Sequence, residues 1–97
     1  MTSQFELAWA LAKAEAPRLR RADRNRIYAE IGAGETYSAI VRLLTTAARG
    51  SLPLPLELIG EIRRWLFGYI GTPDEPRLRR LVDDLQLNPA LPTRTPL

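Results

Sequence analysis

Arginine is the residue type in this chain with the clearest capacity for chemistry. Five arginines and only one acid, Asp23, lie within residues 17–26, a net charge of +4 against +3 for the whole chain. This local excess of positive charge predicts contact with phosphates or with an acidic protein surface. The alternative is a solvated turn in which the arginine stems cover apolar surface. The nucleic-acid-binding hypothesis rests on Arg18, Arg20, Arg21, Arg24, Arg26, Arg42 and Arg49.

Side chains suited to enzymatic chemistry are scarce. The chain has no cysteine and no histidine. Disulfides, thiolate nucleophiles, cysteine or histidine metal sites and histidine acid–base catalysis are therefore excluded. Ser38 and Ser51 have no histidine to activate them, and the neighbouring Asp83 and Asp84 would diverge by about 100° on a helix. We therefore expect a protein that is not an enzyme and that binds no cofactor and no metal.

The elements that must position the arginines are helices. No alternating run of β-branched residues has the length of a strand, so the sequence predicts an all-α protein. Caps, glycines and prolines divide the chain into five predicted helices. Four of them cover about Ser3–Ala16, Leu19–Ile31, Glu35–Arg49 and Pro55–Ile70, and the fifth opens at Thr72-Pro73-Asp74-Glu75. A later start of the second helix, with Asp23 as its cap, is an alternative.

The predicted architecture is a compact bundle of four to five short helices, with the helix at about 55–70 in the centre. Residues 1–87 form a single predicted domain, and residues 88–97, with three prolines, an extended tail. No stretch approaches the ~20 apolar residues of a membrane span, and the N-terminus lacks the pattern of a signal peptide. We expect a cytoplasmic protein. Lys13 is the one lysine among 14 basic residues, a bias typical of a GC-rich bacterium, such as an actinobacterium, or its phage.

The predicted helix at 55–70 has more apolar surface than an ordinary surface helix needs. Its large apolar side chains cover an arc of about 200°, whereas a stripe of ~100° or somewhat more is enough to face a core. The helix is therefore either central or covered on a second side by a partner. Arg63 lies inside the apolar arc, where it either extends its charged end to water or pairs with an acid.

The first predicted helix carries two apolar stripes. They are Phe5, Trp9, Ala12 and Ala16 and, roughly opposite, Leu7, Leu11 and Ala14. One stripe serves the core, and the other would be exposed in a lone monomer, which is a mark of an interaction surface. The alternative is that Leu7 and Leu11 pack under the proline-rich tail.

These patterns predict a small non-enzymatic interaction or regulatory protein that binds another protein, with a second copy of itself as one option. The predicted contact residues are Leu7, Leu11, Trp65 and Phe67, with Arg63 as a polar anchor, because aromatic and arginine side chains are common hot spots. Nucleic-acid binding through the arginines is the alternative. An apolar protein contact should survive raised salt, whereas nucleic-acid binding should weaken steeply with it.

Overall fold

The computed structural model describes residues 3–50 and 52–86 of the chain. Over these residues it contains five α-helices, one short 3₁₀ turn and no strand, so the all-α prediction is confirmed. The elements are α1 (Gln4–Glu15), η1 (Ala16–Arg18), α2 (Arg21–Gly32), α3 (Thr36–Gly50), α4 (Leu56–Phe67) and α5 (Glu75–Gln86). The tail predicted at 88–97 lies outside the described residues.

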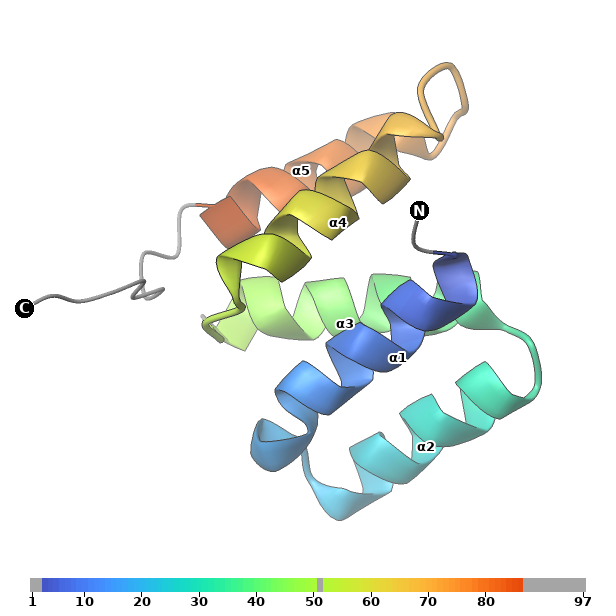
Figure 1. The fold of residues 1–97 in the computed structure, drawn as a ribbon, viewed down its shortest axis with the longest axis vertical. Helices are drawn as coiled ribbons and strands as arrows, with labels where there is room; N and C mark the ends of the chain where they lie inside the picture. Colours follow the sequence, from blue (N-terminus) through green and yellow to red (C-terminus); the bar gives the residue numbers. More distant parts are fainter. Residues whose placement is uncertain (1–2, 51, 87–97) are drawn as a thin grey trace, which may run out of the picture. The chain divides into compact units, whose positions relative to one another are not determined.

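The chain divides into two compact units, and the boundary falls within α3. The first unit runs from Met1 to Leu43, and the second begins at Leu44. In the first unit, α1 and α2 lie side by side and antiparallel, with η1 between them (Figure 1). In the second unit, α4 and α5 form an antiparallel hairpin (Figure 1). No helix in the described parts of the chain has the length and hydropathy needed to cross a membrane.

The start of α1 follows the predicted capping box. The Ser3 hydroxyl accepts a hydrogen bond from the backbone N–H of Glu6 at 3.0 Å, and the Glu6 carboxylate accepts one from the backbone N–H of Ser3 at 3.0 Å. Two N–H groups that a helix start leaves unpaired are thereby satisfied. The buried face of α1 consists of Leu7, Ala8, Leu11, Ala12 and Glu15.

The start of α2 differs from both predicted positions. Pro17 lies within a 3₁₀ turn, in which the N–H of Leu19 donates to the carbonyl of Ala16 at 3.1 Å, and α2 begins only at Arg21. Its N-cap is Arg20, which makes no side-chain capping bond. The predicted glycine stop is confirmed, because Gly34 has φ +85°, a left-handed conformation that favours glycine.

In the second unit, α4 ends earlier and α5 begins later than predicted. Helix α4 ends at Phe67 rather than Ile70, because the N–H of Gly68 bonds to the carbonyl of Trp65 at 3.1 Å and tightens the chain into turns. Helix α5 begins at Glu75, and the proline in its first turn is Pro76 rather than Pro73. The two shortened ends leave the turn residues 68–74 between the helices.

Candidate functional site

A shallow groove of about 320 Å³ lies along α4 and α5 in the second unit. Its lining comes from one side of α4, the turn after it and the first turns of α5. The lining residues are Arg63, Leu66, Phe67, Ile70, Glu75, Arg79, Val82 and Asp83. We call this surface the α4–α5 groove.

Two apolar side chains of the groove are open to solvent. Phe67 is 73% exposed and Ile70 is 56% exposed, whereas Val82 is buried. Gly68 ends α4 directly after Phe67, so the chain turns and brings Ile70 to the same groove. Large exposed apolar side chains rimmed by charge are typical of surfaces that contact other molecules.

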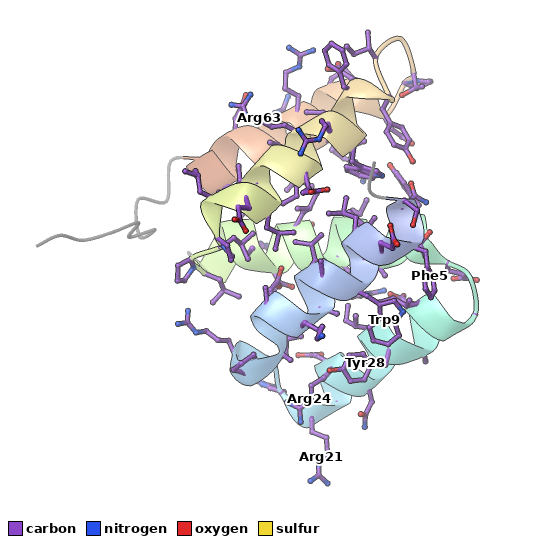
Figure 2. The ribbon with its side chains drawn as sticks, viewed as in Figure 1. Phe5, Trp9, Arg21, Arg24, Tyr28 and Arg63 are labelled. Carbon is purple, nitrogen blue, oxygen red and sulfur yellow. The ribbon has the colours of Figure 1, made fainter. Side chains whose placement is uncertain are left out.

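Four charged side chains border the apolar part. Arg79 is paired with Glu75 of the same helix, because its guanidinium Nε donates to the Glu75 carboxylate at 2.7 Å. Arg63 and Asp83 have no hydrogen bond or ion pair among the residues that the structure describes. A cation and an anion, neither of them paired within the described chain, therefore stand on the same open apolar surface. Figure 2 shows Arg63 projecting from α4.

The predicted contact residues fall into two groups. Arg63 and Phe67 line the groove, whereas Trp65 is half-buried, lies with its ring centroid 5.0 Å from that of Tyr69, and is absent from the lining. Leu7 and Leu11 are 2% and 0% exposed. The helical period identified two apolar stripes on α1, but it could not tell which side chains are buried. The buried face takes Leu7 and Leu11 from one stripe and Ala12 from the other. Phe5 is 51% exposed.

The arginine run lies on η1, the start of α2 and the turn between them. Arg18, Arg20, Arg21 and Arg26 are all exposed. Arg24 is half-buried, and its guanidinium donates to the carbonyl of Ala16 at 3.2 Å. This single bond leaves most of the five N–H donors of Arg24 available. The run is therefore an accessible cationic surface of the first unit.

Arg42 and Arg49 differ from that run. Arg42 makes a bidentate contact with Glu30, with N–O distances of 3.2 and 2.9 Å, and this hydrogen bonding raises the pKa of Arg42. Arg49 is exposed near the end of α3, beyond the boundary between the two units. Arg42 is thus engaged in a contact between α2 and α3, and its charge is partly neutralised by Glu30.

Three aromatic rings lie beside the arginine run, a feature that the sequence interpretation missed. The rings of Phe5 and Trp9 are 6.4 Å apart and meet edge to face, and those of Trp9 and Tyr28 are 5.4 Å apart. Figure 2 shows five side chains of α1 and α2 in a row, in the spatial order Phe5, Trp9, Tyr28, Arg24 and Arg21. We call these five residues the aromatic–arginine face. The sequence does contain a signal for this face. Phe5 and Trp9 are four residues apart, as are Arg24 and Tyr28, and residues four apart lie on the same side of a helix.

One carboxyl group is buried without a partner in the described part of the chain. Glu15, the last residue of α1, is 1% exposed, and neither carboxylate oxygen has a hydrogen bond among the described residues. Burial raises its pKa from 4.5 to about 8, because desolvation disfavours the charged form. At neutral pH the group is therefore mostly protonated.

Acidic side chains of the described residues form no group of three or more that could hold a metal ion. No protein-family model, no curated protein and no solved structure matches the chain.

Proposed function

We propose that this chain is a non-enzymatic interaction or regulatory protein that binds protein through the α4–α5 groove. The observation that carries the proposal is one groove in which exposed Phe67 and Ile70 accompany Arg63 and Asp83, two charges that no described residue pairs. The apolar side chains supply the favourable burial. The two charges supply orientation and specificity.

The occupant that these charges favour is the same groove on a second copy of the chain. In a two-fold contact the same patch faces itself, so residue i of one copy meets residue j of the other and the reverse. Arg63 of one copy then meets Asp83 of the other, twice, while Phe67 and Ile70 of the two copies cover one another. A partner surface of one charge sign would leave either Arg63 or Asp83 buried without a counter-charge, which is costly.

The mass of the protein in solution tests this proposal. Light scattering during size exclusion, over a range of protein concentrations, should give a mass approaching twice the 10.9 kDa of one chain. Phe67→Ala should weaken the association because it removes the largest exposed apolar side chain of the groove. Raised salt should weaken the association only moderately, since apolar burial is not screened.

A charge exchange tests the pairing itself. Arg63→Asp and Asp83→Arg should each favour the monomer, because each places like charges opposite one another across the two-fold contact. An equimolar mixture of the two variants should associate again, because both contacts then join opposite charges. The double variant should also associate with itself, for the same reason.

The neighbouring residue supplies a matched control. Arg64 is exposed on the same helix, interacts with Glu61 at 3.7 Å and does not line the groove. Arg64→Asp carries the same change of charge and should leave the association intact. A wild-type mass of one chain at every concentration would overturn the proposal, and so would dissociation by Arg64→Asp that equals the effect of Arg63→Asp.

A further inference from the structure

The aromatic–arginine face of the first unit places partly exposed rings beside a dense positive charge. Phe5 is 51% exposed, and Trp9 and Tyr28 are half-buried, so none of the three residues is fully enclosed by the chain. Arg24 and Arg21 follow on the same side of α2 (Figure 2). The surrounding segment, residues 17–26, carries a net charge of +4.

The rings and the arginines of this face match the two chemical parts of a single-stranded nucleic acid, its bases and its phosphates. Unpaired bases stack on aromatic rings, and phosphates are attracted to arginine. A duplex holds its bases stacked inside, so it would use the arginines and leave the rings without a partner. An acidic peptide would likewise use the arginines alone.

We propose that the aromatic–arginine face binds single-stranded nucleic acid, with bases against Phe5, Trp9 and Tyr28 and phosphates against Arg21 and Arg24. Charge complementarity with the +4 segment supports a polyanion as the occupant. The face shares no residue with the α4–α5 groove. This inference is therefore independent of the proposed protein contact, and either can fail without the other.

The experiment measures the binding of short fluorescein-labelled oligothymidylate and oligouridylate by fluorescence anisotropy across a series of salt concentrations. Trp9→Ala should lower the affinity by roughly tenfold or more, the effect expected when a base-stacking ring is removed. It should leave the salt dependence unchanged, because no charge is removed. Arg21→Gln with Arg24→Gln should reduce the slope of log affinity against log salt by about 0.7 for each phosphate that is no longer neutralised.

Two controls separate the site from general effects. Arg77→Gln with Arg80→Gln removes the same charge from exposed positions on α5 and should leave the slope nearly unchanged. Trp9 is half-buried, so circular dichroism should confirm that Trp9→Ala remains folded. The more exposed Phe5→Ala provides a second ring variant, with a smaller decrease in affinity expected because Phe5 lies at the end of the line of rings.

Fluorescence gives a direct test of stacking. The chain has two tryptophans, so a Trp65→Phe background leaves Trp9 as the one tryptophan reporter. Saturating oligonucleotide should quench its emission. Absence of binding at low salt would overturn the proposal. Binding that Trp9→Ala and Phe5→Ala leave unchanged, or that polyaspartate or duplex matches in affinity, would also overturn it and would indicate contact with charge alone.

Discussion

The carboxyl group of Glu15 links the fold to pH at the scale of a single residue. Its pKa is about 8 in the folded chain because burial disfavours the carboxylate, against 4.5 for an ordinary glutamate. Below pH 4.5 both the folded and the unfolded chain are protonated here. Between these two values the unfolded chain loses the proton and the folded chain keeps it, so stability falls as pH rises.

We therefore predict that the free energy of unfolding decreases between about pH 5 and pH 8 by about 1 kcal/mol per pH unit from this residue. Glu15→Gln should remove that component, because the amide does not ionise. Urea unfolding followed by circular dichroism at several pH values measures both proteins. The variant should be the more stable protein at about pH 8, even though its buried amide also lacks a described partner. Parallel pH profiles for the two proteins would show that Glu15 is not the group responsible.

At the scale of the element, the need for glycine in the turn between α2 and α3 is set by the backbone conformation and not by the room for a side chain. A Cβ at Gly32 or at Gly34 would have open space, with no atom within 4 Å beyond the adjacent residues and the backbone of its own helix. They differ in dihedral angle, because Gly34 has φ +85° and Gly32, the last residue of α2, does not have a positive φ. The same substitution should therefore have opposite effects at the two positions.

We predict that Gly32→Ala stabilises the protein by roughly 0.5–1 kcal/mol, because alanine favours the helix and restricts the unfolded chain. Gly34→Ala should destabilise it by about 1–2 kcal/mol, the cost of a side chain in the left-handed region. Chemical denaturation of both variants under identical conditions provides the comparison. Equal effects would mean that the turn relaxes to a different conformation when Gly34 is replaced.

The elements were largely predictable because their signals are local. The Ser3–Glu6 capping box and the Gly34 stop involve residues close in sequence, and the structure places both as expected. The ends at Phe67 and Glu75 were not predicted correctly. Two prolines, Pro73 and Pro76, compete for the first turn of α5, and the sequence pattern does not decide between them.

The surfaces were less predictable, because they depend on how helices face one another. Arg63 and Phe67 were predicted contact residues and do line the α4–α5 groove, but Asp83 and Ile70 join them only through the hairpin of α4 with α5. Leu7 and Leu11 form a stripe as regular as that of Phe5 and Trp9. Periodicity alone does not show that Leu7 and Leu11 are buried while Phe5 is exposed.

At the scale of the whole molecule, a two-fold contact through the α4–α5 groove would couple stability to protein concentration. A partner that binds the folded chain and not the unfolded one stabilises the fold by mass action. At a concentration about ten times the dissociation constant, this adds about 1.4 kcal/mol. For a chain of this size, that free energy corresponds to a rise in Tm of roughly 5–10 °C.

We predict that the Tm of the wild-type protein rises with its concentration, whereas that of Arg63→Asp stays constant, because the variant cannot form the Arg63–Asp83 pairs between copies. Differential scanning calorimetry over a wide range of concentrations measures both. The double variant Arg63→Asp with Asp83→Arg should recover the dependence on concentration, which distinguishes disruption of the pairing from a damaged fold. A wild-type Tm that does not change with concentration would mean that no second copy covers the exposed Phe67 and Ile70 of the groove.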